Sequence, residues 1–341
     1  MVVANATVNT CRFPPPPAAS RRAPREAAAA GMPATPLKTS APRRPLPRVR
    51  TIPVMHRMNP RHYCLSRLFF ALPAILVLLA TVAPASPAAA TQPAAQPATP
   101  PDAARFDLYL LVGQSNMAGR GPLTGADRAP DPRILVFGPG DAWQLQGEPV
   151  HFDKPKAAGV GLGFTFAKLM AAQKPGVTIG LIPCAVGGTP QSRWMPDGDL
   201  YKEAVRRARL AQPSGKLRGI LWHQGESECG SETKARAYAA NLAKIVAGFR
   251  RDLDAPDVPF VAGELGEFLY TRTANKSPWA RVVNEQIDSL PTLVAAAASV
   301  PSHGLAHKGD ELHFGADAQR EFGKRYAAAM IRLQAAAPEK P

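Results

Sequence analysis

The stretch FDLYLLVGQSNMAG, residues 106–119, joins an apolar run directly to a polar turn that contains one serine. The run is short and apolar throughout, which is typical of a parallel strand buried on both faces. Ser115 follows it, between the amide side chains of Gln114 and Asn116. Ligands of parallel sheets bind beyond the carboxyl ends of the strands. The stretch therefore predicts an α/β fold, in which Ser115 is either a nucleophile or a residue that only begins a helix.

Similar apolar runs alternate with helical patterns along the rest of the chain. Four more apolar runs are bounded by turn residues, at 176–184, 216–225, 258–266 and 291–300. Apolar residues recur at helical spacing in five segments, at 163–173, 199–212, 233–253, 277–290 and 316–334. This alternation predicts one central parallel sheet with helices packed on its faces.

The first 90 residues differ in composition from the rest. Residues 1–57 are rich in Pro, Ala and Arg and contain too little apolar surface to offset the entropy of folding, so we interpret them as disordered or untranslated. Residues 58–90 have a basic start, an apolar run and small residues, as secretory signals do. The apolar run is interrupted by Pro73 and is shorter than the roughly 20 residues of a membrane span. We expect export to the periplasm or medium, without stable membrane insertion after cleavage.

The net charge is also distributed unevenly between the first 90 residues and the rest of the chain. We expect a Pro/Ala linker at 91–104 and a single domain at 105–334. Of the net charge of +15, residues 1–90 carry +11, because they hold 12 Lys and Arg residues and one acidic residue. The remaining +4 gives no reason to expect nucleic-acid binding. Cys184 and Cys229 lie in the predicted domain, where they form either a disulfide or two buried thiols.

Polar segments follow the predicted strands and bear the groups that acyl transfer requires. That reaction needs a hydroxyl, a base, a carboxylate that orients the base, and donors for the oxyanion. Ser115 supplies the hydroxyl, and the segment GDELHF near the end of the chain supplies Asp310 and His313. Since His313 lies three residues after Asp310, one turn can bring the carboxylate to Nδ1 and leave Nε2 facing the serine.

Four motifs occur in a fixed order, namely GQSNMAG, GLIPCAVGGT, LWHQGESE and DELHF. They resemble the SGNH-type hydrolases, in particular the carbohydrate esterase and sialate O-acetylesterase-like (acetylxylan esterase-like) family, over residues 107 to about 330. The resemblance implies a single three-layer, flavodoxin-like SGNH domain with a central parallel sheet flanked by helices. It also implies a serine esterase without metal or cofactor, which removes O-acetyl groups from a carbohydrate through an acetyl-serine intermediate.

The resemblance assigns roles to individual residues. Ser115 would be the nucleophile, with Asp310 and His313 as its partners. The oxyanion hole would be formed by the amides of Ser115 and Gly188 and the side chain of Gln224. Five further residues are expected to orient this set or to contact substrate: Gln114, Asn116, Gly187, Glu226 and Trp194. His223 and Glu226 flank Gln224 and are expected to orient the site rather than to react, whereas Trp194 either stacks on a sugar ring or fills a local core.

Two other functions stay open at this point. One is a general SGNH lipase or thioesterase, which would prefer long acyl esters to acetate esters. The other is a sugar-binding protein that kept the fold and lost turnover. A metal site at His303, His307 and His313 is not favoured, because their spacing matches no zinc pattern. The sequence also lacks the G-x-S-x-G motif around Ser115, which argues against an ordinary α/β-hydrolase.

Overall fold

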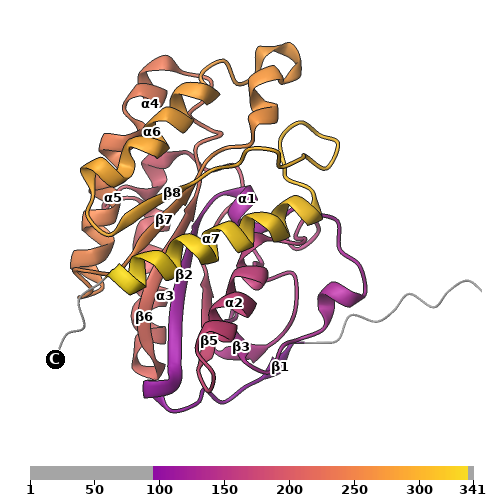
Figure 1. Cartoon of the computed structure of the whole chain (residues 1–341), viewed down its shortest axis with the longest axis vertical. Helices are drawn as coiled ribbons and strands as arrows, with labels where there is room; N and C mark the ends of the chain where they lie inside the picture. The colour runs from indigo at the N-terminus through magenta and orange to yellow at the C-terminus, as the bar shows by residue number, and fades with distance from the viewer. Residues whose placement is uncertain (1–94, 337–341) are drawn as a thin grey trace, which may run out of the picture. The chain divides into compact units, whose positions relative to one another are not determined.

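One mixed sheet organises the part of the chain that the computed structural model describes, residues 95–336 (Figure 1). The predicted segments 1–57 and 58–90 lie outside the described residues. The strand order is β1-β4-β3-β5-β2-β6-β7-β8. The strands from β3 to β8 in this order run parallel, and β4 and β1 continue the sheet antiparallel at one edge. Their bounds are β1 Gln96–Pro97, β2 Phe106–Gly113, β3 Ile134–Phe137, β4 Trp143–Leu145, β5 Thr178–Pro183, β6 Lys216–His223, β7 Phe260–Gly263 and β8 Ala297–Val300.

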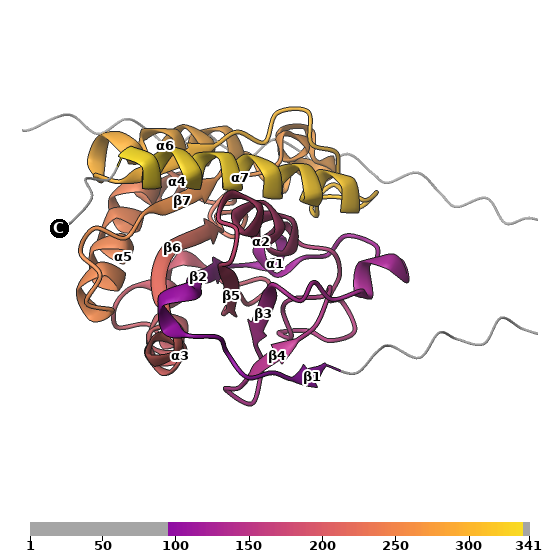
Figure 2. The same cartoon turned by 60° about the horizontal axis from the view of Figure 1, so that its bottom comes forward.

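Helices cover both faces of the sheet. One apolar core is formed with α3, α4, α5 and α6, and a second core on the other face is formed with α1, α2 and α7. Figure 1 shows α7 crossing the sheet on the same side as α2, and Figure 2 shows the two helices adjacent from a second direction. The helices are α1 Ser115–Ala118, α2 Leu162–Gln173, α3 Asp199–Ala211, α4 Glu232–Arg236, α5 Tyr238–Asp252, α6 Ala280–Leu293 and α7 Ala316–Ala336. The predicted three-layer α/β class is confirmed.

The central strand β2 fixes where the predicted motifs meet. All eight of its residues are buried, and it pairs in parallel with β5 on one side and β6 on the other. At its carboxyl end the backbones approach closely, because a Cβ added to Gly113 would lie 2.1 Å from the carbonyl oxygen of His223. Gly113 also has a φ of 134°, which a residue with a side chain rarely adopts. The turns after β2, β5 and β6 therefore lie at one edge of the sheet.

Three strands were not predicted from the sequence. β3 is only four residues long, β4 is half-buried, and β1 contains two residues. β1 belongs to the segment predicted as a linker, 91–104, and its two residues pair with β4 at the edge of the sheet. Pairing of this kind uses the backbone groups of an edge strand, so it leaves little trace in side-chain composition.

The helical prediction differs from the structure at two places. The segment predicted as one helix, 233–253, is divided at Ala237 into α4 and α5. α6 continues through Pro291 to Leu293, so the strand predicted at 291–300 is shortened to β8. Pro291 lies in the last turn of α6, where few backbone bonds remain to be broken. Within residues 95–336, no helix is long and apolar enough to cross a membrane.

Candidate active site

A serine, a histidine and an aspartate form a hydrogen-bonded chain at the carboxyl edge of the sheet. The Nε2 atom of His313 lies 3.0 Å from Ser115 Oγ, and its Nδ1 atom lies 2.7 Å from Asp310 Oδ2. Ser115 is the first residue of α1, directly after β2, whereas the other two residues precede α7. Ser115 and His313 are thus almost 200 residues apart in the sequence. This geometry allows the imidazole to accept the serine proton while the carboxylate holds Nδ1–H.

The loop that bears Asp310 and His313 is closed on itself. Its ends form an antiparallel bridge between His307 and Phe314, and the amide of Lys308 donates to the carbonyl of His313 at 2.9 Å. The ring of His307 accepts from the amides of Gly309 and Glu311 at 3.0 and 3.1 Å, which caps the turn from inside. Most of the geometry of this loop is therefore set within eight residues.

The carboxylate of Asp310 is held in its charged form by the same loop. Burial by itself would raise its pKa, but the amides of His313 and Leu312 donate to Oδ1 at 2.8 and 3.0 Å, and the His313 ring contacts Oδ2. Together they lower the pKa of Asp310 to about 2. Lys308 Nζ also lies near this carboxylate, at 3.6 Å from Asp310 Oδ2. Asp310 therefore stays ionised and can stabilise a protonated His313.

The backbone amides of Ser115 and Gly188 donate no hydrogen bond within residues 95–336. Gly188 is exposed and has a φ of 78°, the left-handed region that glycine tolerates. Gly187, which precedes it, is buried, and a Cβ added there would lie 3.3 Å from Ser115 Cβ. The Gly187–Gly188 turn thus lies against the nucleophile.

Gln224 lies under this turn and is fully buried. Its side-chain nitrogen contacts three acceptors, the Thr189 carbonyl at 3.1 Å, Gln114 Oε1 at 3.3 Å and a Glu228 carboxylate oxygen. Its side-chain oxygen accepts from Tyr238 at 3.1 Å. In this arrangement the amide links the turns after β2, β5 and β6, and a bond to an oxyanion would have to replace one of these contacts.

Asn116 connects the nucleophile turn to the loop of His313. Its Nδ2 donates to Glu226 at 2.6 Å and to the Leu312 carbonyl at 3.1 Å, and its Oδ1 accepts from the Phe314 amide at 3.1 Å. The last two contacts grip the backbone on either side of His313. Asn116 is buried, so its role in this structure is to orient the site.

The remaining predicted residues lie behind the triad. Burial by itself would raise the pKa of Glu226, but His223 and Asn116 hold it below its usual value. Gln114 is buried and its Oε1 accepts from Ser227 at 3.2 Å. Trp194 is fully buried and donates to Thr189 Oγ1 at 3.2 Å, which supports the local-core alternative over stacking on a sugar.

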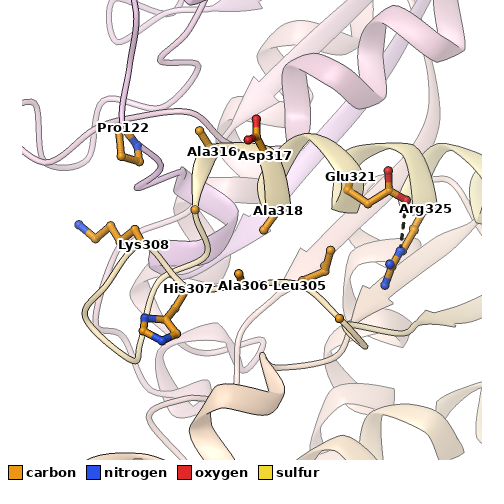
Figure 3. Close-up of a pocket in the computed structure, with 12 residues that line it drawn as sticks. Pro122, Leu305, Ala306, His307, Lys308, Ala316, Asp317, Ala318, Glu321 and Arg325 are labelled. Carbon is orange, nitrogen blue, oxygen red and sulfur yellow. Dashed lines mark ion pairs between the residues drawn. The ribbon is translucent and has the colours of Figure 1, made fainter.

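A hollow of about 570 Å³ lies beside the loop of Asp310 and His313 (Figure 3). It is lined by the segment 304–308, by residues at the start of α7 and by Pro122. None of the three triad residues lines it. In Figure 3 Lys308 points away from α7, while Glu321 and Arg325 form an ion pair on that helix. The hollow therefore adjoins the loop of Asp310 and His313 but does not include Ser115.

Sequence reasoning missed several polar residues around the site, namely Arg120, Asp153, Lys154, Glu228 and His307 as a cap of the loop. Arg120 directly follows the motif GQSNMAG and could have been noticed there, whereas Asp153 and Lys154 lie in an irregular segment without a motif. In the described residues no cluster of three His, Cys, Asp or Glu side chains is arranged to hold a metal ion. The structure places Cys184 and Cys229 as free thiols.

Comparisons with known proteins agree with the fold and identify a family. A family model described as carbohydrate esterase, sialic acid-specific acetylesterase, matches residues 105–332. A probable carbohydrate esterase of Arabidopsis thaliana is 29% identical over 259 residues, covering 70% of this chain and 94% of that protein. The crystal structure of an Arabidopsis thaliana protein superposes with a TM-score of 0.60 at 28% identity, covering 66% of this chain and 98% of the other. NanS, with a TM-score of 0.55 at 21% identity, covers 69% of this chain and 99% of its own and shares the fold.

Proposed function

Since the chain belongs to the carbohydrate esterase, sialic acid-specific acetylesterase family, we propose that it is a serine esterase that removes O-acetyl groups from a carbohydrate through an acetyl-serine intermediate. The observation that carries this proposal is the chain of contacts from Ser115 Oγ through His313 to Asp310, at 3.0 and 2.7 Å. An ordered hydroxyl, imidazole and carboxylate constitute the machinery of acyl transfer on many unrelated folds.

In the first half of the reaction Ser115 Oγ attacks the carbonyl carbon of the acetyl ester. His313 Nε2 takes the serine proton, and the Asp310 carboxylate stabilises the imidazolium through Nδ1–H. The carbonyl oxygen becomes an oxyanion, for which the amides of Ser115 and Gly188 are the donors we assign. When the intermediate collapses, the C–O bond to the sugar breaks and His313 returns the proton to the departing sugar oxygen.

In the second half a water molecule replaces the sugar. His313 takes a proton from this water as it attacks the acetyl-serine carbonyl carbon, and the same amides receive the second oxyanion. The bond to Ser115 Oγ breaks, the serine recovers its proton from His313, and acetate leaves. Each step uses side chains and amides of this chain, so the two halves share one site.

We expect the protein to act on its substrate outside the cytoplasm. This part of the proposal rests on the signal-like composition of residues 58–90, which lie outside the described residues. The N-terminus of the mature protein, read by mass spectrometry, tests it. A start between residues 85 and 95 supports export, and recovery of an intact leader in the cytoplasm contradicts it.

Acetate release tests the proposed chemistry directly. We would incubate the protein with acetylated xylan, O-acetylated sialic acid and acetylated peptidoglycan fragments, and with esters of increasing acyl length. We expect acetate from at least one carbohydrate, and slower turnover as the acyl chain lengthens. A preference for long acyl esters would instead identify a lipase or thioesterase, and glycan binding without acetate release would identify a sugar-binding protein.

Ser115→Ala is the matched control. It should keep its melting temperature and lose turnover by roughly 10⁴-fold or more, because only oxyanion donors and substrate binding remain. Mass spectrometry of the parent protein, quenched during turnover, should detect one added acetyl group on the peptide that contains Ser115. A folded Ser115→Ala protein that keeps about a tenth of the parent rate would exclude the assignment.

A further inference from the structure

An ion pair that none of the roles above uses is buried next to the nucleophile. Arg120 Nη2 lies 2.6 Å from Asp153 Oδ2, and the two side chains are 4% and 3% exposed. Desolvation of two charges is costly, so a buried pair is weak evidence for stability by itself. The position of this pair, two residues after α1 and against the Gly187–Gly188 turn, points to a different use.

Asp153 also holds the backbone of that turn. The Oδ2 atom that contacts Arg120 accepts from the Gly187 amide at 2.8 Å. Burial by itself would raise the pKa of Asp153, but the Gly187 amide and Arg120 hold it below its usual value. Burial lowers the pKa of the neighbouring His151 to about 3, so this ring is neutral and adds no third charge. Asp153 is therefore a fixed carboxylate with Gly187 as one of its two donors.

Lys154 holds the other side of Gly187. Its Nζ donates to the Gly187 carbonyl at 3.0 Å. A trans peptide is planar, so the Gly188 N–H points opposite to the Gly187 C=O in the same plane. A contact that fixes the carbonyl therefore also fixes the direction of the Gly188 amide. The preceding peptide is fixed as well, since Thr189 Oγ1 donates to the Val186 carbonyl at 2.8 Å.

No space separates this arrangement from the nucleophile. A Cβ added to Gly187 would lie 2.7 Å from Arg120 Nη2, 3.2 Å from Asp153 Oδ2 and 3.3 Å from Ser115 Cβ. Gly187 is thus packed between the ion pair and the serine. A small movement of the pair would be transmitted to the turn without any gap to absorb it.

We propose that Arg120, Asp153 and Lys154 are positioning residues, which fix the Gly187–Gly188 peptide so that the Gly188 amide is aimed at the oxyanion. This inference rests on the proposed function, because it assigns residues to the oxyanion side of that reaction. An amide that is aligned in advance stabilises the transition state without reorganisation. Disturbing it lowers kcat and leaves KM nearly unchanged, since the bound ester carries little charge on its carbonyl oxygen.

Two double variants separate positioning from stability. Arg120→Met with Asp153→Asn, and Arg120→Met with Asp153→Leu, both remove the two buried charges, but only the asparagine keeps an acceptor for the Gly187 amide. We expect similar KM values, a lower melting temperature in the leucine variant because the Gly187 amide loses its acceptor, and a kcat about 10-fold to 100-fold lower in that variant when both are measured well below their melting temperatures. Equal kcat values in the two folded variants would overturn the proposal.

Lys154→Met supplies a test that does not depend on the buried pair, because Lys154 is exposed and its loss leaves the core intact. We expect kcat to fall by about threefold to tenfold with unchanged KM and melting temperature, and Lys154→Arg to restore part of the loss. An unchanged kcat in Lys154→Met would remove Lys154 from the proposal.

Asp107→Asn is the matched control for a buried carboxylate. Asp107 is buried near the start of β2, at the opposite end of the strand from Ser115, and contacts Lys174 and Arg218 at 3.0 and 3.1 Å. The Asp107→Asn variant should have a lower melting temperature, and its kcat should not fall selectively relative to its KM. If the parent protein releases no acetate from any ester, the proposed function and this inference both fail. If the parent protein releases acetate and Ser115→Ala does not, the proposed function holds. Equal kcat values in the two double variants would then refute this inference alone.

Discussion

The two sides of the candidate site are built in different ways. On one side, Asp310 and His313 lie in a loop that is closed by contacts within residues 307–314, to which Asn116 adds two bonds to the backbone on either side of His313. On the other side, the Gly187–Gly188 turn is held by Asp153 and Lys154 from an irregular segment and by Gln224, through Thr189, from the turn after β6. A short closed loop can preserve its geometry when distant parts of the protein move, whereas the glycine turn depends on several segments at once. The base side should therefore tolerate substitution better than the oxyanion side.

Among the substitutions on the two sides, Gly187→Ala is expected to lower kcat the most. Its Cβ would lie 2.7 Å from Arg120 Nη2, and this atom is buried and paired, so it cannot move away freely. We expect kcat to fall by roughly 100-fold, since misplacement of a catalytic donor by about 1 Å has an effect of that size. Steady-state kinetics with an acetyl ester measure it, and thermal melting shows whether the fold is kept. A kcat within about twofold of the parent would mean that the turn can adapt.

Gln224→Ala tests whether Gln224 stabilises the Gly187–Gly188 turn or donates directly to the oxyanion. Because its amide contacts Thr189, Gln114 and Glu228, we expect a lower melting temperature and a kcat reduced by about tenfold or more, with KM also disturbed. A selective loss of kcat at unchanged stability would instead identify Gln224 as a direct donor to the oxyanion. Normal kinetics with normal stability would contradict both roles.

His307 tests the base side in the same way. Its Nδ1 accepts from two amides of the catalytic loop, and Asn places an oxygen at nearly the same position, whereas Leu does not. We expect His307→Asn to stay within about twofold of the parent kcat and His307→Leu to lose about threefold to tenfold, because water can replace part of the lost contacts in this exposed loop. Identical kinetics of the two variants would show that the ring does not order the loop.

The smallest expected effect is the pH dependence of stability that Asp310 contributes. Its pKa is lowered from 3.8 to about 2 in the folded protein. Its charged form therefore stabilises the fold above about pH 3.8, and this contribution is lost as the pH falls toward 2. The difference in melting temperature between the parent and Asp310→Asn should narrow as the pH falls from about 4 toward 2. A difference that stays the same across this acidic range would contradict the lowered pKa.

The sequence alone determined the class of the fold because its central strands are buried on both faces. β2, β5, β6 and β7 are mostly apolar and largely buried, and α3 and α5, which lie between them in the chain, are amphipathic. β1 and β4 are short or half-buried and carry no such pattern, whereas β3 is apolar, buried and as long as β7 and was nevertheless missed. The helix predicted at 277–290 continues in the structure to Leu293, through a residue assigned to the next strand. Burial leaves a mark on composition, and backbone pairing at an edge does not.

For the site, the sequence determined which chemistry is available, and the tertiary structure decided what holds it in place. Asp310 and His313 lie three residues apart, so their contact is a property of one turn and can be anticipated from spacing. The approach of His313 to Ser115 follows from the order of the parallel strands together with the position of α7. The contact of Asp153 with Gly187 joins two residues that are 34 apart in the sequence and that both lie in irregular segments, which have no periodicity to reveal it. Long-range polar contacts are fixed by packing of the whole domain, because a buried donor must find its acceptor wherever the fold places it.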